Sequence, residues 1–440
     1  MSEINASNFK KEHGDLAPDL VGVTELTSPY FFVPPSGTTA ERPENCEPGT
    51  LRFNTDIGSL EVFRGDTIGW EQIQRRVDQY LGGGTGSNLG TGTRGMMFNG
   101  PTPSFSNSIR FITVSTTGAD EDFGDTTAAK ANCISFGGRV RAASMGGQTT
   151  PSGSSWTNDV EMVIVASKGD STDYATLTTN KKEGGGLSNE IRALYVGGGY
   201  NIIESVTISQ GGDFVDFGDL SNNAEQLAAM SSPTRGVFTM NSLIPQYSSS
   251  NQIEFVTMMS TGNSIDFGDM TSVRFANNSG SNATRGIIAN GYNPSPSGAV
   301  QNIAEFLTIS TTGNTIDFGD TTQARYSSFG SCCSRTRMVI PGGYVAPAPV
   351  TTIDSFEIST TGNAIDFGDM TFSNNRDGAS GSSKTRGIVG AGGDPGSSPY
   401  AKTNTICFVE IATTGNAADF GDLTMIRNHM AGCSNGHGGL

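Results

Sequence analysis

The chain has 440 residues, of which 35% are hydrophobic and 59 are glycine, and its formal net charge at pH 7 is −16. This acidic balance disfavours nucleic-acid and anionic-membrane partners, because both bind clustered Lys and Arg. The abundant glycine follows no three-residue register and indicates many tight turns. No run approaches the ~18 apolar residues of a membrane span, and the first residues lack the pattern of a signal peptide.

The cysteine and histidine content argues against a disulfide framework and against metal chemistry. The six cysteines are Cys46, Cys133, Cys332, Cys333, Cys407 and Cys433. They form no C-x-x-C motif and no paired spacing, which favours a reducing compartment. With three histidines in the chain, a zinc or copper centre is not expected, and we predict no cofactor and no metal.

The first ninety residues divide into an arm, a small β module and a linker. Residues 1–48 are polar and contain scattered prolines, which predicts an extended anchoring arm that orders only against a partner. Residues 49–81 are predicted to form a small three-stranded β module, with strands at Leu51–Phe53, Leu60–Phe63 and Trp70–Ile73. Such a sheet is marginal alone, so we expect it to associate with itself or with another protein. Residues 82–92 read as a flexible Gly/Ser/Thr linker.

From residue 93 onward one phrase restarts seven times, at intervals of about 50 residues, which is the kelch spacing. The restarts are Arg94, Arg141, Arg192, Arg235, Arg285, Arg337 and Arg386. Units of this kind cannot bury their faces alone and stack radially. We therefore predict an all-β fold in which residues 93–440 form a seven-bladed kelch-like β-propeller.

Each repeat predicts four strands. A short apolar strand follows the arginine, and an alternating strand such as A-E-F-L-T-I-S comes next. A Gly followed by Asn or another small or polar residue then marks a hairpin, because Gly and Asn tolerate positive φ. The return strand carries D-F-G-D, and a small, polar segment suits the crowded strand beside the axis. The final such segment, N-H-M-A-G-C-S-N, has no repeat after it. It should therefore complete the first blade and close the ring.

The D-F-G-D motif starts at Asp122, Asp216, Asp266, Asp317, Asp366 and Asp419, while the second repeat reads D-Y-A-T from Asp173. No other protein-kinase motif accompanies it. We interpret the Phe as packing between blades. The Asp pair is expected to serve turns and cross-blade hydrogen bonds, with the repeat-start arginines as partners. A calcium site between carboxylates is the alternative.

A second periodic acid, on the third strand of five repeats, is expected to pair with the same arginines. It is Glu161, Glu204, Glu254, Glu305 and Asp354.

An aromatic residue occurs in the loop between the second and third strands of every repeat. These residues are Phe105, Trp156, Tyr200, Tyr247, Tyr292, Tyr344 and Tyr400. In a propeller all seven loops share one face, so the rings could form a circle that binds a glycan or a protein through flat apolar area with a polar tip. In the other interpretation each ring packs on its own Pro-rich loop.

Two phrases carry a resemblance to known proteins. The phrase G-x-L-R-F-N-T-D-x-x-S-L-E-V-F, followed by Trp70, resembles a module of tail-fibre and other virion proteins of marine tailed phages, especially cyanophages. The repeat, with I-S-T-T-G-N-A-I-D-F-G-D and T-R-G-I, is similar to kelch-like repeats in structural proteins of such phages. Together they cover residues 50–73 and 93–440. The resemblance implies a virion appendage or decoration protein without catalysis.

The sequence thus predicts a virion structural protein, assembled in the host cytoplasm and present in several copies per particle. Residues 1–81 would bind other virion proteins, and the propeller would be displayed, with a host-surface glycan as a candidate ligand. No nucleic-acid binding, membrane insertion or enzymatic activity is expected. The alternative is a glycan-processing enzyme on a propeller scaffold, although neither a sialidase-type Asp-box with Trp nor a nucleophile–base arrangement can be named.

Overall fold

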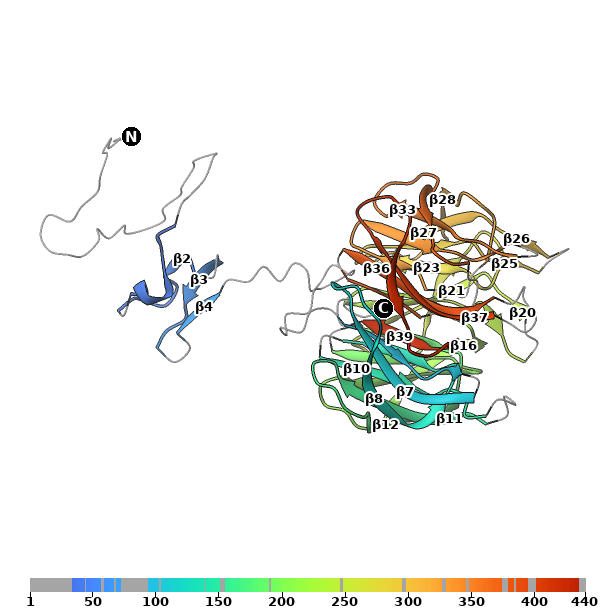
Figure 1. Ribbon diagram of the computed structural model, residues 1–440, viewed down its shortest axis with the longest axis horizontal. Coiled ribbons are helices and arrows are strands. Elements are labelled where there is room, and N and C mark those ends of the chain that lie inside the picture. Colours follow the sequence, from blue (N-terminus) through green and yellow to red (C-terminus); the bar gives the residue numbers. More distant parts are fainter. Residues whose placement is uncertain are drawn as a thin grey trace, which may run out of the picture. The chain divides into compact units, whose positions relative to one another are not determined.

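The computed structural model describes residues 34–43, 45–56, 59–66, 69–72, 94–102, 104–138, 140–150, 155–189, 191–245, 248–294, 298–326, 330–345, 348–373, 379–383, 385–394 and 401–434. The chain divides into two compact units, Met1–Arg76 and Val77–Leu440. Both are built from β-strands, with one 3-10 turn, η1 (Thr39–Glu41), among the described residues (Figure 1). The predicted linker and most of the predicted arm lie outside the described residues.

The first unit contains one four-stranded sheet. Its strands, in spatial order, are β1 (Ser36–Gly37), β2 (Leu51–Asn54), β3 (Ser59–Phe63) and β4 (Trp70–Gln72). The three expected strands are present, and the sheet gains a fourth, β1, from the segment that the sequence analysis placed in the arm. β1 runs parallel to β2. The N–H groups of Phe53 and Thr55 donate to the carbonyls of Pro35 and Gly37, so β1 covers the edge of β2.

The second unit contains seven antiparallel sheets that share the same four-strand core in its described residues. We number these sheets 1 to 7. Sheet 1 is β39 (Ala431–Ser434), β5 (Arg94–Phe98), β7 (Ser104–Thr113) and β8 (Glu121–Lys130); sheet 2 is β9 (Ile134–Gly137), β10 (Arg141–Met145), β11 (Thr157–Ile164) and β12 (Thr172–Lys181). Sheet 3 is β13 (Gly185–Ser188), β14 (Arg192–Val196), β15 (Tyr200–Thr207) and β16 (Val215–Glu225); sheet 4 is β17 (Ala228–Ser231), β18 (Arg235–Thr239), β21 (Gln252–Thr257) and β22 (Ile265–Asp269).

Sheets 5 to 7 repeat this order. Sheet 5 is β23 (Asn278–Ser281), β24 (Arg285–Ala289), β27 (Ile303–Thr308) and β28 (Ile316–Asp320); sheet 6 is β29 (Cys332–Cys333), β30 (Arg337–Pro341), β33 (Thr352–Glu357) and β34 (Ile365–Asp369). Sheet 7 is β35 (Ala379–Ser382), β36 (Arg386–Asp394), β37 (Ala401–Glu410) and β38 (Ala418–Asp422). Short strands fill the loops: β6 (Pro101–Thr102), β19 (Ser242–Leu243), β20 (Ser248–Ser249), β25 (Tyr292–Asn293), β26 (Ala299–Val300), β31 (Tyr344–Val345) and β32 (Ala348–Pro349).

The hydrophobic core of the second unit lies between the sheets. Seven clusters of buried side chains each join two neighbouring sheets, and one of them joins sheet 7 to sheet 1. The Phe of each D-F-G-D motif is buried in one of these clusters, as the sequence analysis expected. A four-stranded sheet cannot bury both faces alone, so each sheet depends on its two neighbours.

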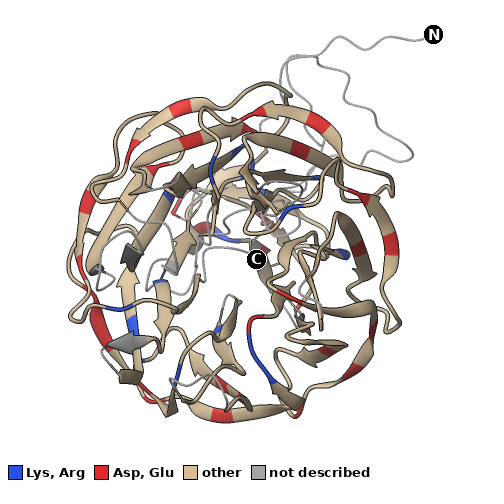
Figure 2. Ribbon diagram, turned by 90° about the vertical axis from the view of Figure 1, so that its right-hand side faces the viewer, with Lys and Arg blue, Asp and Glu red and all other residues tan. Residues whose placement is uncertain are grey.

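The first strands of the seven sheets contact one another in a cycle. β9 contacts β13, and the series continues through β17, β23, β29 and β35 to β39, which returns to β9. Most of their residues are small or polar, with Ile134, Phe136, Leu187 and Met230 as the exceptions, and hydroxyls bridge neighbouring strands. For example, Ser135 donates to the carbonyl of Gly432, and Ser434 donates to that of Ser382. Figure 2 shows the sheets arranged around an axis, with acidic residues along the outer rim.

The C-terminal strand completes the sheet that begins at Arg94, as predicted. β39 pairs antiparallel with β5, with Ala431 opposite Phe98 and Ser434 opposite Gly95. Sheet 1 is therefore assembled from both ends of the second unit. The pairing removes an open edge from β5.

A backbone hydrogen bond recurs at six of the seven junctions between sheets. The N–H of the hairpin Gly in one sheet donates to the carbonyl of the motif Phe in its neighbour, at 2.7 Å in every case; the pairs are Gly169–Phe123, Gly262–Phe217, Gly313–Phe267, Gly362–Phe318, Gly415–Phe367 and Gly118–Phe420. The two backbones approach so closely that the motif must contain Gly. At Gly268, whose φ is +139°, a Cβ would lie 2.5 Å from the carbonyl oxygen of Gly313.

The junction of sheets 2 and 3 is built differently, because the second repeat has Tyr174 and Ala175 in place of Phe and Gly. Here the N–H of Phe214 donates to the carbonyl of Thr176 at 2.9 Å. The Tyr174 hydroxyl donates to the carbonyl of Ile208 at 2.7 Å. The bond from Phe214 has an equivalent at the other six junctions, such as the bond from Ser264 to Asp219, so the bond from the Tyr174 side chain is the one that is particular to this junction.

The Asn that follows the hairpin Gly has a role that the sequence analysis missed. Asn263, Asn314, Asn363 and Asn416 are not among the residues with positive φ. Their side-chain carbonyls each accept the backbone N–H of the second motif Asp in the preceding sheet, at 3.0 to 3.1 Å. The Asn residues were expected to permit the hairpin, and instead they connect sheets.

The repeat-start arginines also connect sheets, and the expectation that they pair with the motif aspartates is wrong. Each donates from Nη1 to a backbone carbonyl at the end of the third strand of the next sheet. The donor–acceptor pairs are Arg94–Val165, Arg141–Ile208, Arg192–Met258, Arg235–Ile309, Arg285–Ile358, Arg337–Ile411 and Arg386–Val114. Each guanidinium also lies over a Phe or Tyr ring, as Arg285 does over Phe306 at 4.3 Å. In four repeats the first motif aspartate instead accepts the N–H of its own motif Gly, as Asp266 does from Gly268, and Asp122 pairs with Arg110.

Replacing Gly268 by Ala should destabilise the second unit far more than replacing Gly313 by Ala. Both glycines have positive φ, but a Cβ at Gly313 meets nothing within 4 Å. We expect the free energy of unfolding to fall by about 3–4 kcal/mol for Gly268→Ala and by about 1–2 kcal/mol for Gly313→Ala. Chemical denaturation of the two variants measures the difference, and equal losses would contradict the close backbone approach.

A chain that ends at Met430 should lose the cooperative thermal transition of the second unit and aggregate, because β5 becomes an unpaired edge. A chain that ends at Ser434 keeps β39 and is the matched control, with an unchanged melting temperature. Calorimetry and light scattering compare the two chains. Identical behaviour would show that β39 does not hold sheet 1 together.

Candidate binding surfaces

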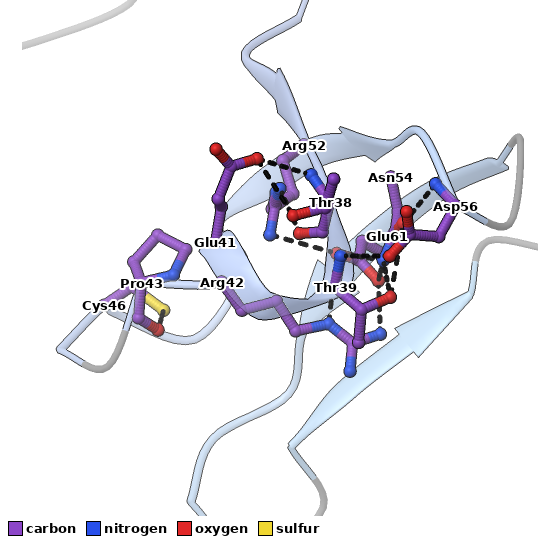
Figure 3. A network of polar contacts seen from close by, with 10 residues as sticks. All are labelled: Thr38, Thr39, Glu41, Arg42, Pro43, Cys46, Arg52, Asn54, Asp56 and Glu61. Carbon is purple, nitrogen blue, oxygen red and sulfur yellow. Dashed lines mark hydrogen bonds and ion pairs between the residues drawn. The ribbon is translucent and has the colours of Figure 1, made fainter.

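The sheet of the first unit buries charge on its covered face (Figure 3). The Glu61 carboxylate is fully buried, forms an ion pair with Arg42 at 2.7 Å and lies 3.5 Å from Arg52. Asn54 donates to the same carboxylate. The hydrogen bond from Arg42 holds the pKa of Glu61 below its ordinary value, so the group remains ionised beneath η1.

The opposite face of this sheet carries apolar side chains. Leu51 lies opposite Val62 and Phe53 opposite Leu60 across β2 and β3, so all four point away from the buried charges. Leu51 is 48% exposed and Leu60 is 39% exposed. We call these four residues the apolar face of the first unit. A self-sufficient domain buries its apolar side chains and exposes its charges. The sheet of the first unit does the opposite, because it exposes these leucines and buries Glu61.

The predicted loop aromatics of the second unit occupy two different positions. Tyr247 and Tyr400 lie outside the described residues. Tyr292 and Tyr344 stand at the start of their loops, in β25 and β31. Phe105, Trp156 and Tyr200 stand at the loop ends, where the third strands begin. The structure therefore does not place the five described residues as equivalent members of one circle.

Two further aromatics, Phe275 and Tyr326, join the loop tyrosines into a continuous row. Each lies in the connection between two sheets and pairs its backbone with a loop start, Phe275 with Tyr292 and Tyr326 with Tyr344. The ring centroids of Phe275 and Tyr292 are 5.4 Å apart, those of Tyr292 and Tyr326 are 5.7 Å apart, and those of Tyr326 and Tyr344 are 5.4 Å apart. We call these four half-buried residues the aromatic row.

The sequence contained a signal for the two residues that were missed. Phe275 and Tyr326 each follow a buried arginine, in V-R-F-A and A-R-Y-S. The alternative interpretation, in which each loop aromatic packs on its own loop, applies to Tyr292. A Cβ on Gly298 would collide with the Tyr292 hydroxyl, so this tyrosine packs over its own loop as well as joining the row.

A different group of side chains lies around Trp156. The Lys182 ammonium is 5.4 Å from the Trp156 ring centre and forms an ion pair with Glu183 at 3.0 Å. Burial, followed by the nearby charge of Glu183, raises the pKa of Glu225 above its ordinary value. This sector is charged, in contrast to the aromatic row.

The periodic acids of the third strands form buried ion pairs, but the predicted partners are wrong. The pairs are Glu161–Lys130, Glu204–Lys181, Glu305–Arg274 and Asp354–Arg325, with N···O distances of 2.6 to 2.9 Å and side chains at most 1% exposed. Arg274 and Arg325 come from connections between two sheets, and Lys130 and Lys181 are the last residues of β8 and β12. The repeat-start arginines bind backbone carbonyls and rings instead, and two of them, Arg337 and Arg386, also pair with Glu357 and Glu410. In sheet 4, Glu254 accepts hydrogen bonds from Ser221, Ser264 and Gln252.

The described residues show no arrangement for metal or thiolate chemistry. No group of three or more His, Cys, Asp or Glu side chains among them is placed to hold a metal ion. None of the six cysteines forms a disulfide, and burial raises the pKa of Cys332, Cys333 and Cys433 to about 12. In the same part of the chain, no helix has the length and apolarity that crossing a membrane requires.

Comparison with models of known protein families and with curated proteins finds no match to this chain.

Replacing Arg274 by Met should lower the free energy of unfolding by about 3–5 kcal/mol, because it leaves the buried Glu305 carboxylate without a counter-charge. Replacing Glu305 by Leu as well should recover most of this loss, since an apolar pair of similar volume often substitutes for a buried ion pair. Denaturant titration of the single and double variants tests the pairing. A double variant less stable than the single one would show that Arg274 is not Glu305's main partner.

Proposed function

We propose that this chain is a structural protein of a tailed-phage virion, attached to the particle by its first unit and presenting its second unit to the host surface. The proposal rests on the resemblance of two sequence phrases to virion proteins of marine phages. The structural observation that carries it is the division of the chain into two units. The first unit has an exposed apolar face, and the sheets of the second unit bury one another's apolar side chains.

We further propose that the second unit is a seven-bladed kelch-like β-propeller. Its support is the sevenfold repeat of the four-strand sheet, the inter-sheet core at every junction, and the pairing of β39 with β5. In this arrangement the loops between second and third strands share one face. That face carries the aromatic side chains and is the surface through which the protein recognises a partner.

The apolar face of the first unit is the proposed attachment surface. Leu51, Phe53, Leu60 and Val62 carry no charge, although Glu71, opposite Val62 on β4, forms an exposed ion pair with Arg64 beside them; the Arg42–Glu61 pair lies beneath the sheet. Another virion protein with an apolar patch would cover these side chains and supply the hydrophobic burial that a sheet of this size lacks. Residues 1–33, which belong to the predicted anchoring arm, would bind to the same protein.

A glycan-processing enzyme is the second candidate function, favoured by the surroundings of Trp156. Two carboxyl groups of unequal environment, Glu183 and Glu225, lie near an indole ring there, and the raised pKa of Glu225 suits a proton donor. Glu225→Gln would abolish turnover of a polysaccharide by the isolated second unit if this function held. A lack of turnover by the unaltered protein favours the structural function.

Deletion of residues 1–81 should leave a folded, monomeric second unit that no longer joins particles. In the full chain, the double variant Leu51→Asp, Leu60→Asp should be lost from purified virions without a change in the melting temperature of the second unit. The matched control is the double variant Ile265→Asp, Ile316→Asp, which alters two exposed aliphatic side chains of the second unit. Quantitative mass spectrometry of virions measures incorporation, and normal incorporation of the leucine variant would refute attachment through the apolar face.

A further inference from the structure

We infer that the aromatic row is a binding site for an extended, uncharged glycan chain, confined to the sector of sheets 4 to 6. This inference deepens the proposed recognition function and rests on it for its biological meaning. Its physical basis is independent, because it depends only on the side chains of this sector. The site is a single track across three sheets and not a sevenfold circle.

The row is continuous because connection and loop residues alternate along it. Phe275 leads from sheet 4 to sheet 5, Tyr292 belongs to sheet 5, Tyr326 leads from sheet 5 to sheet 6, and Tyr344 belongs to sheet 6. Backbone hydrogen bonds hold each connection against the adjacent loop. The N–H of Tyr292 donates to the carbonyl of Phe275 at 2.9 Å, and the N–H of Tyr344 donates to the carbonyl of Tyr326 at 2.8 Å. The rings are thus held in place before any ligand arrives, which lowers the entropic cost of binding.

The rings suit sugars because they are half-buried and three of them have hydroxyl tips. Ring contacts of this kind, tilted or edge-on, leave part of each ring open. An exposed ring face can cover the C–H face of a saccharide, and the phenol hydroxyl can hydrogen-bond its hydroxyl groups. The successive rings then contact successive units of a chain, so the row suits an oligomer better than a single sugar.

The absence of charge selects a neutral ligand. The described segments of this sector are residues 272–282, 290–294, 298–303, 322–326, 330–334, 341–345 and 348–352, and their only charged residues are Arg274 and Arg325. Both arginines are fully buried and paired with carboxylates. The polar side chains of these segments are amides and hydroxyls, such as Asn293, Gln301 and Gln323. The sector therefore offers no cation to an acidic polysaccharide, which the chain's net charge of −16 would also repel.

A folded protein or peptide partner is less well matched to this surface. Protein interfaces concentrate their affinity in anchors that fill pockets, often with arginine and charged pairs at the rim. The row is a line of partly covered rings with uncharged surroundings. The charged sector around Trp156, Lys182 and Glu225 would suit such a partner better.

The test uses the full chain and isothermal titration calorimetry with linear oligomers of glucose, mannose and N-acetylglucosamine. Oligogalacturonate and heparin-derived oligomers are the acidic counterparts. We expect binding to at least one neutral series, with affinity that rises with oligomer length and changes little with salt. The acidic oligomers should not bind, and their binding at equal or higher affinity would overturn the inference, as would a failure of every neutral series.

Four variants locate the site. Tyr326→Ala and Tyr344→Ala should each weaken binding roughly tenfold, the effect of losing about 1.4 kcal/mol of ring contact. Tyr326→Phe, which keeps the ring, should retain most of the affinity. The control Tyr200→Ala removes an exposed aromatic of another sector and should leave binding unchanged. Melting temperatures of all four show that the sheets remain intact.

The outcomes separate this inference from the proposed function. Loss of affinity in Tyr200→Ala but not in Tyr326→Ala would overturn the aromatic row while leaving the virion function intact. Glycan binding through the row by a protein that is absent from purified particles would support the row and refute the virion function. A proline-rich or apolar peptide that binds the row in preference to every glycan would overturn the assignment of a sugar ligand.

Discussion

The second unit depends on one close contact, the hydrogen bond between the backbone of a hairpin turn in one sheet and the motif Phe of its neighbour. This bond is possible because the motif Gly has no Cβ, so that two backbones meet where a side chain would otherwise stand. The Phe side chain then lies in the core between the same two sheets. The D-F-G-D phrase is therefore a connector between sheets, and its recurrence reflects the number of junctions.

Polar groups reinforce the junctions in two further ways. Repeat-start arginines donate to carbonyls at the end of the next sheet and cover aromatic rings. At four junctions, buried cations at the ends of fourth strands or in the connections pair with the periodic acids. Both kinds of contact join residues of different sheets, so an isolated sheet would contain unsatisfied buried charge. The sheets are interdependent for electrostatic as well as hydrophobic reasons.

The repetition of the scaffold leaves the loops free to differ, and the candidate binding surfaces lie where the repeat is broken. Sheets 5 and 6 have a tyrosine at the loop start, and their preceding connections provide Phe275 and Tyr326. Sheets 2 and 3 carry Trp156, Lys182 and Glu225 in the corresponding region. The first unit departs from ordinary domain construction in another way, because it buries an Arg–Glu network and exposes leucines. The exposed leucines leave apolar surface in contact with water, which is a reason to connect this face with binding.

The sequence by itself determined the repeat, the strand order within each sheet, and the pairing of residues 431–434 with the first sheet, because these follow from spacing, alternation and turn residues along one stretch of chain. The extra strand β1 and the partners of the arginines, asparagines and periodic acids were decided by tertiary structure. So was the aromatic row, since the sequence pattern named Tyr292 and Tyr344 but did not show that Phe275 and Tyr326 contact them. These interactions join residues of different sheets or segments, and the direction of a side chain across such a junction is set by packing, which local sequence patterns do not encode.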